Sequence, residues 1–372
     1  MPSFREAQYR YAWHYRQLGD EAEQLYKMGG KNVLRGLALF DRERIHFETA
    51  FEVLSHALHQ ATPEDHISAD SRAATLLVSL VGSTAHLCYL RFHPGQRIRW
   101  FETQGHAAGI IGNLRQEGNA IGNLGGVYYA LGDTSKAVEL YQQALVIDRK
   151  IGDRRGESVD LGNLGLAYAV LGQTSKAIAC YEQQLDMARE IHDRRGESIA
   201  LNNLGLAYAD TGDTGMAIAT YEQKLKVVRE IGDLHGEGSA LNNLGIVFNS
   251  LGNLEKSIEL SEQALAIARE IGDRRGACAA LGNLGNAHAS LGDSRKAAEF
   301  QEKSLGIARQ IGDRRGEGGA LWSLAKELWR AGDRTQAIIR AESALKIYEA
   351  LADPNIAKIR AELSQWRGQS FL

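Results

Sequence analysis

The chain has 372 residues, of which 24% are charged, and a formal net charge of −3. This balance does not favour nucleic acid or an anionic membrane, so we expect neither as a partner. The three cysteines, Cys88, Cys180 and Cys278, are odd in number and far apart, which is typical of core thiols in a reducing cytosol. No apolar run approaches the ~20 residues of a membrane span, and we predict a cytoplasmic protein.

An internal period of 40 residues dominates the sequence. The tripeptide Asn-Leu-Gly recurs at this spacing, and a sixth copy is altered to Ser323-Leu324-Ala325. The five intact copies begin at Asn123, Asn163, Asn203, Asn243 and Asn283. A fixed period of this length predicts a solenoid in which each repeat packs on its neighbours.

Each repeat contains two amphipathic segments, as residues 153–192 illustrate. Apolar residues at helical spacing run from Val159 to Val170, and Leu171-Gly172 ends this first segment. A second apolar stripe runs from Ala177 to Ile191 and ends near the next Asp, which caps the following helix. We therefore predict two antiparallel helices per repeat, A and B. Glycine within helix A and small residues in helix B predict close contact between the two.

This pattern resembles the tetratricopeptide repeat. Leu-Gly is followed by a tyrosine three residues later, by the small residue of helix B, and by an aromatic residue four positions further on. The 40-residue period resembles the long-helix variant of Pins-type spindle adaptors, kinesin light chains and bacterial signalling ATPases. The resemblance covers about residues 111–352 and implies an all-α fold, a right-handed α-solenoid of antiparallel helix pairs. The helix-B aromatic is replaced at Ser261, Gln301 and Ala341, so the last repeats pack differently or act as a cap.

The flanking regions depart from the period. Residues 67–110 read as a degenerate repeat, with Ser68–Leu90 as helix A and Pro94–Gly109 as helix B. Residues 1–66 form a non-repeat segment with predicted helices over Phe4–Met28 and Leu37–Gln60, and residues 353–372 a capping helix and tail. Helix starts are expected at Thr62-Pro63 and Asp353-Pro354.

The N-terminal segment resembles the helical stretch that joins the nucleotide-binding module to the repeats in STAND-type signalling ATPases. His46 stands where that family often has Asn. The matching residues are His14-Tyr15, Leu18, Ala22-Glu23, and Arg42-Glu43 followed by Ala50. The resemblance implies a nucleotide-binding module upstream in a larger protein.

Signals of catalysis are absent from the sequence. Gly29-Gly30-Lys31 lacks the first glycine and the Ser/Thr of a phosphate loop. His56, His59 and His66 have no nearby cysteine to complete a zinc site. We expect no cofactor, no metal and no enzymatic activity.

The asparagine before Leu-Gly gives the most specific site prediction. The resemblance places it on helix A, facing the concave groove where family members hold a peptide. An amide offers both a donor and an acceptor, as a peptide backbone requires. Alternatively, these asparagines bond one another as a structural ladder. The further candidates for the groove are Asn202, Asn242, Tyr129, Asn286, Trp322, Lys326, Trp329 and Arg330.

Arginine pairs recur at the start of helix A, beginning at Arg154, Arg194, Arg274 and Arg314. They form either ion pairs between repeats or an electropositive rim that steers an acidic ligand. Trp322 is either a ligand anchor or part of a cap over the last groove segment.

Two functions fit these features. In the first, the chain is the ligand-recognition part of a STAND-type signal transduction ATPase and binds a peptide, a protein or a small effector in its groove. In the second, it is a freestanding cytosolic scaffold that tethers partner proteins. A longer reading frame with an upstream phosphate loop would distinguish them.

Overall fold

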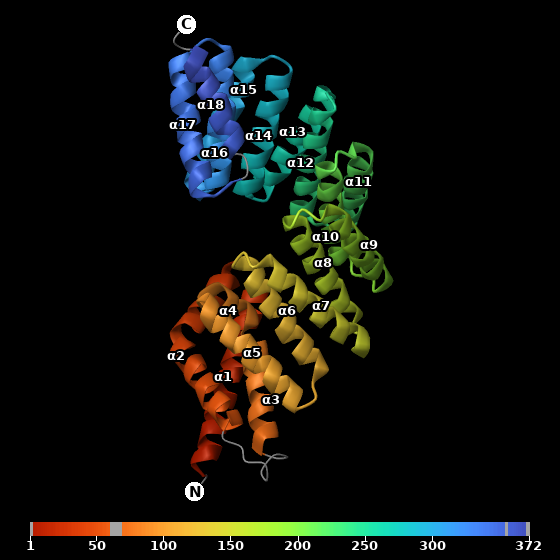
Figure 1. Cartoon of the computed structure of the whole chain (residues 1–372), viewed down its shortest axis with the longest axis vertical. Helices are drawn as coiled ribbons and strands as arrows, with labels where there is room; N and C mark the ends of the chain where they lie inside the picture. The colour runs from red at the N-terminus through yellow and green to blue at the C-terminus, as the bar shows by residue number, and fades with distance from the viewer. Residues whose placement is uncertain (1–2, 60–68, 354–355, 370–372) are drawn as a thin grey trace. The chain divides into compact units, whose positions relative to one another are not determined.

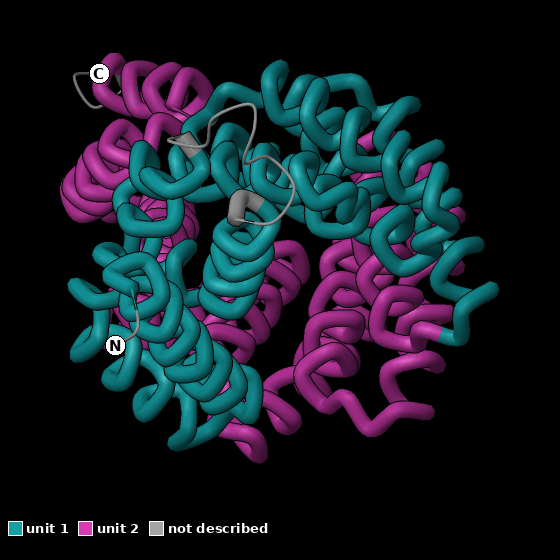
Figure 2. The backbone as a smooth tube through the Cα atoms, turned by 90° about the horizontal axis from the view of Figure 1, so that it is seen from below, with its two compact units in different colours: residues 1–192 teal, residues 193–372 magenta. Residues whose placement is uncertain are grey.

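The computed structural model describes residues 3–59, 69–353 and 356–369, in which it contains 18 helices and no strand (Figure 1). The chain divides into two compact units, residues 1–192 and 193–372 (Figure 2). The predicted helix starts at Thr62-Pro63 and at Pro354, and His66, lie outside the described residues.

The helices of the first unit are α1 (Phe4–Lys27), α2 (Lys31–His59), α3 (Ala69–Gly82), α4 (Ala85–Arg91), α5 (Pro94–Ile110), α6 (Leu114–Ala130), α7 (Thr134–Ile151), α8 (Arg154–Val170) and α9 (Thr174–Glu190). Those of the second unit are α10 (Arg194–Asp210), α11 (Thr214–Glu230), α12 (Leu234–Ser250), α13 (Leu254–Glu270), α14 (Arg274–Ser290), α15 (Ser294–Ile311), α16 (Arg314–Arg330), α17 (Arg334–Ala350) and α18 (Ile356–Gln369). From α6 to α17, consecutive helices pack in antiparallel pairs within each unit, which confirms the predicted α-solenoid.

Two local features, side-chain capping and left-handed glycine, determine where the repeat helices begin and end. At Asp153 the carboxylate accepts the backbone N–H of Gly156 at 3.2 Å, and Asp193 does the same for Gly196 at 2.9 Å. These bonds satisfy donors that the first turn of a helix leaves free. The preceding loops place glycine in the left-handed region, as at Gly152 with φ 69°, where glycine has no Cβ penalty.

The N-terminal helices differ from the prediction at two places. α2 begins at Lys31, six residues before the predicted Leu37, because Gly29 and Gly30 both adopt positive φ and make the whole turn. The predicted single helix over Ser68–Leu90 is two helices, α3 and α4, which meet at a 62° bend. At the bend Thr84 Oγ1 donates to Leu80 O at 2.9 Å, so its side chain satisfies a carbonyl at the end of α3.

No single helix in the described part of the chain is long and apolar enough to span a membrane; α3 and α4 reach that length and composition only together, across their bend. Their apolar side chains belong to the core of the first unit. The same core stacks Phe51 on Trp100, with ring centroids 4.5 Å apart.

Within the repeats, glycine on helix A receives a tyrosine ring from helix B. A Cβ on Gly205 would stand 2.7 Å from both Cδ1 and Cζ of Tyr221, and the other tyrosine pairs have similar geometry. Serine and glutamine take the place of the ring in later repeats: Ser261 lies against Gly245 and Gln301 against Gly285. The loss of the aromatic side chain therefore changes the packing of the second unit toward its C-terminus.

Candidate functional site

The A helices expose one face that combines asparagine with apolar side chains. On α10, Asn203 lies between Ile199 and Leu206, which are 55% and 45% exposed. On α12, Ile246 is likewise exposed and lies one turn from Asn243. In the first unit, α8 repeats the pattern around Asn163, with Val159, Leu166 and Val170 exposed.

This exposed apolar face corrects the sequence analysis, which counted Val159 and Val170 as one apolar set with the core positions of helix A. The buried side of α8 carries Leu161, Leu164 and Ala167. Helical spacing identifies both sets, but it cannot say which of them meets a neighbouring helix. The apolar residues of helix A that meet no neighbouring helix form an exposed surface that extends beyond the asparagines.

Four of the predicted asparagines form a ladder within the second unit. Asn243 Nδ2 donates to Asn202 Oδ1 at 3.3 Å, and Asn283 Nδ2 donates to Asn242 Oδ1 at 3.2 Å. In each case the partners are 41 residues apart, so an Asn-Asn pair in one repeat supports the Asn of the next. The side chains of Asn202 and Asn242 thus link neighbouring A helices.

The other asparagines of the row have no hydrogen-bond partner among the described residues. Asn123 is exposed, and Asn163 and Asn203 are half-buried. Within the first unit, the residue 41 positions before Asn163 is Gly122, which has no side-chain amide that could accept from Asn163. The ladder therefore occurs at some repeats only, and whether the remaining asparagines contact a ligand stays a prediction.

The ammonium group of a buried lysine donates a hydrogen bond to the ladder. Lys224 of α11 donates to Asn202 Oδ1 at 2.9 Å and to Ser239 Oγ at 3.1 Å. Burial lowers the pKa of Lys224 to about 8. A cavity of about 220 Å³ lies between α12, α13 and α14, and two residues of the ladder, Asn242 and Asn243, line it.

The aromatic candidates are packed against other rings. Trp322 and Trp329 of α16 both stack on Trp366 of α18, with centroids 5.4 and 4.7 Å apart and ring planes within 12° and 7°. Tyr129 packs on the apolar cluster that contains Tyr141. The two tryptophans therefore make the contacts of a cap at the end of the array.

The remaining candidates line a different pocket. Asn286, Lys326 and Arg330 surround a polar cavity of about 310 Å³ between α14, α15 and α16. The sequence analysis missed two of its buried members, Gln301 and Glu327. The signal was available, because each is a polar residue at a position held by tyrosine or by a small apolar residue in earlier repeats.

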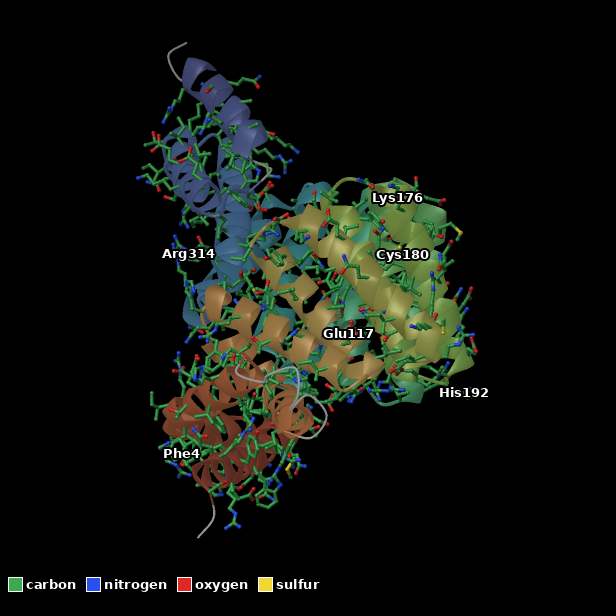
Figure 3. All side chains as sticks on the ribbon, turned by 60° about the horizontal axis from the view of Figure 1, so that its bottom comes forward. Phe4, Glu117, Lys176, Cys180, His192 and Arg314 are labelled. Carbon is green, nitrogen blue, oxygen red and sulfur yellow. The ribbon has the colours of Figure 1, made fainter. Side chains whose placement is uncertain are left out.

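The first arginine of each recurring pair is engaged in local contacts. Arg314, labelled in Figure 3, pairs with Glu317 one turn later on α16, and Arg194 pairs with both Glu197 and Glu230. Arg154 pairs with Glu157, as Arg194 does with Glu197, and Arg274 donates to Gln310. These contacts join the start of helix A to its own first turn and to the end of the following helix B.

The described residues contain no group of three or more His, Cys, Asp or Glu side chains that could hold a metal ion. The buried thiol of Cys88 has a pKa raised to about 12 by burial, so it is not a reactive thiolate at neutral pH.

Comparison with known proteins identifies the repeat. Family models of the tetratricopeptide repeat match residues 120–155, 157–230 and 236–310. No curated protein sequence matches the chain. Tetratricopeptide repeats indicate a protein-interaction domain, and solenoids of this fold are typically non-catalytic scaffolds.

Several solved structures share the fold over nearly the whole chain. A signal transduction ATPase with numerous domains (STAND) that has a tetratricopeptide repeat sensor, from Pyrococcus horikoshii, is 17% identical, with a TM-score of 0.57; the match covers 100% of this chain and 66% of that one. Aspartyl phosphate phosphatase F from Bacillus subtilis is 15% identical, with a TM-score of 0.55 and coverage of 95% and 94%.

A Rap protein complexed with Competence and Sporulation Factor is 13% identical, with a TM-score of 0.51 and coverage of 95% and 98%. At these identities the likeness concerns the fold. Together with the matched repeats, it leads to one conclusion: the repeat array of this chain is a member of the tetratricopeptide-repeat family.

Proposed function

We propose that this chain is a recognition module that binds an extended peptide segment of a partner protein along the exposed face of α10 and α12. The observation that carries the proposal is Asn203, whose amide has no partner in the described structure and lies between the exposed Ile199 and Leu206. An amide that has no protein partner and lies between apolar side chains suits a peptide, which offers backbone groups for the amide and apolar side chains for its flanks.

The spacing of the helices supports a peptide in an extended conformation. Neighbouring A helices stand roughly 10 Å apart, and an extended chain advances about 3.3 Å per residue. One A helix would therefore meet every third residue of the peptide. Because Asn243 already donates to Asn202, it would contribute its free carbonyl oxygen, whereas Asn203 would contribute both groups.

A peptide display library tests this proposal. Peptides selected on the full chain are expected to be rich in apolar residues. Asn203→Ala should weaken the best peptide by up to about tenfold, the value of one hydrogen bond of ~0.5–1.5 kcal/mol. Replacing both Ile199 and Leu206 by serine should weaken it further, because apolar burial is lost.

Glu222→Ala is the matched control, since Glu222 is exposed on α11, a B helix outside this surface. Melting temperatures should stay close to that of the unaltered chain in all variants. A selected peptide whose affinity is the same for the Asn203 and apolar variants would disprove binding at this face.

We further propose that the module is the sensor part of a STAND-type signalling ATPase, whose ligand is a peptide, a protein or a small effector. Two observations support this: the N-terminal helices resemble the segment that precedes the repeats in that class, and the fold of one such protein aligns with all of this chain. The source gene tests it. An upstream phosphate-loop module in the same reading frame is expected, and a frame that encodes repeats alone would favour a freestanding scaffold.

A further inference from the structure

We call the polar cavity lined by α14, α15 and α16 the α14–α16 pocket; Asn249, near the end of α12, also lines it. Its volume is about 310 Å³, near the lower end of the range of roughly 300–1,000 Å³ for small-molecule sites. The pocket exists because the helix-B tyrosine is missing here. Gln301 lies against Gly285 in place of the ring that Tyr221 lays on Gly205.

Polar residues replace apolar ones around this pocket. Glu327 occupies a position that is valine or alanine in the five preceding repeats, and Lys326 one that is leucine or isoleucine in three of them. Gln301 and Glu327 are only 3% and 5% exposed. Burial of polar and charged side chains opposes folding unless they are fully paired, so stability does not account for this set.

Several of these groups lack partners. Arg330 donates to one oxygen of Glu327, while the other, Oε2, is buried without a hydrogen bond, as is Asn249 Oδ1. Lys326 has no ion pair or hydrogen bond within the described residues, and burial lowers its pKa. The pocket therefore holds one unpaired ammonium group and two acceptor oxygens that lack donors.

Other side chains make the pocket rigid. Gln301 Nε2 donates to Asn286 Oδ1 at 3.0 Å and to Gly282 O at 3.1 Å, and Ser323 donates to the same Asn286 oxygen at 3.4 Å. This network links α14, α15 and α16 without using the unpaired groups. A pre-formed wall around unsatisfied groups is the usual arrangement of a small-molecule site.

We propose that the α14–α16 pocket binds a free α-amino acid, with the carboxylate of the ligand on Lys326 and its ammonium on Glu327 and Asn249. A free α-amino acid carries an anionic acceptor and a cationic donor, which complement the unpaired ammonium group and the two acceptor oxygens of this pocket. A residue inside a peptide has neither charge on its backbone. The ligand proposed for this pocket is thus a small effector, distinct from the peptide proposed for the face of α10 and α12.

Isothermal titration calorimetry on the full chain at pH 7 tests the proposal, with each of the standard amino acids in turn. At least one is expected to bind with one molecule per chain. Its N-acetyl derivative lacks the ammonium and its methyl ester lacks the carboxylate, so each should bind at least about tenfold more weakly, the effect of losing one charged hydrogen bond.

Two variants locate the site. Lys326→Met and Glu327→Gln should each weaken the best amino acid at least about tenfold. Lys346→Met is the control, because Lys346 is exposed on α17 and does not line the pocket, and it should leave the affinity unchanged. Circular dichroism melts establish that the variants are folded. If either fails to fold, the two blocked derivatives decide the question with the unaltered chain.

Three results would overturn the proposal: no heat from any amino acid, a binder whose N-acetyl and ester forms bind equally well, or undiminished affinity in both folded variants. Binding of an N-acetylated acidic dipeptide amide in the absence of any amino-acid binding would also overturn it. That outcome would assign the pocket to the acidic side chain of a peptide.

Discussion

Replacement of Gly205 by alanine should destabilise the second unit, although alanine is the better helix former. The ring of Tyr221 is fully buried against Gly205, and a Cβ there would stand 2.7 Å from two of its ring carbons. Alanine gains about 1 kcal/mol in helix propensity over glycine. Overpacking against a rigid ring costs about 1–3 kcal/mol. We therefore expect a net loss of up to about 2 kcal/mol in the free energy of unfolding.

Urea unfolding of the full chain, followed by circular dichroism, measures this loss. Gly306→Ala is the matched control: Gly306 is exposed inside α15, and a Cβ there would meet nothing within 4 Å beyond the backbone of its own helix. That change should stabilise the chain by up to about 1 kcal/mol. Gly245→Ala should lie between the two, because its neighbour is the small, movable hydroxyl of Ser261.

A double variant separates the ring from other causes. In a Tyr221→Ser background, which reproduces the Gly245–Ser261 combination, the cost of Gly205→Ala should largely disappear. If Gly205→Ala raises the urea midpoint as Gly306→Ala does, the tyrosine does not constrain the helix spacing. A cost that is unchanged in the Tyr221→Ser background would likewise refute the ring as its source.

Burial, together with the nearby Asp148, raises the pKa of Asp160 to about 8, so the folded chain keeps a proton that the unfolded chain releases from about pH 4 upward. The free energy of unfolding should therefore fall as the pH rises from about 4 to 8. The Asp160→Asn variant should show a smaller fall and a higher melting temperature than the unaltered chain at pH 8.5. A pH profile that is unchanged in this variant would contradict the role of Asp160. The pKa of Lys224 is about 8 in the folded chain and about 10.4 in the unfolded chain, so the free energy of unfolding should rise from about pH 8 to 10. The Lys224→Met variant should melt at a higher temperature than the unaltered chain at pH 7 and should not show this rise. Trp366→Ala removes both ring stacks between α18 and α16, so it should speed amide hydrogen exchange in α18 and leave the exchange of α10 unchanged. If α18 exchanges at the same rate in the variant and in the unaltered chain, the stacks do not hold this helix.

Much of the fold could be predicted because its signals are local. The 40-residue period, the Asp or Asn that caps each A helix of the array and the left-handed glycine before it identify helix ends without knowledge of the packing. His192 shows the limit: it adopts φ 56° at a position where other repeats have glycine, because the surrounding repeat still requires the same turn. The bend between α3 and α4 was missed because its cause, at Ser83 and Thr84, is side-chain bonding to the backbone.

The candidate surface could be predicted only in part. The sequence pointed to the asparagine row, but the same tripeptide has different roles in different repeats. Asn243 donates to Asn202, while Asn203 has no partner among the described residues. The exposed Ile199 was not separated from the core by periodicity, because spacing along one helix contains no information on the position of the next.

Within the repeats, then, the sequence by itself determined the helices, their ends, their pairing and the family, because capping, left-handed glycine and amphipathic spacing act between residues only a few positions apart. The tertiary structure decided which polar groups are paired. Whether Trp322 meets Trp366, or the second oxygen of Glu327 meets anything at all, depends on the packing of helices from different parts of the chain. Hydrogen bonds and ring stacks act over a few ångströms in space, and only the assembled repeats bring those atoms within reach.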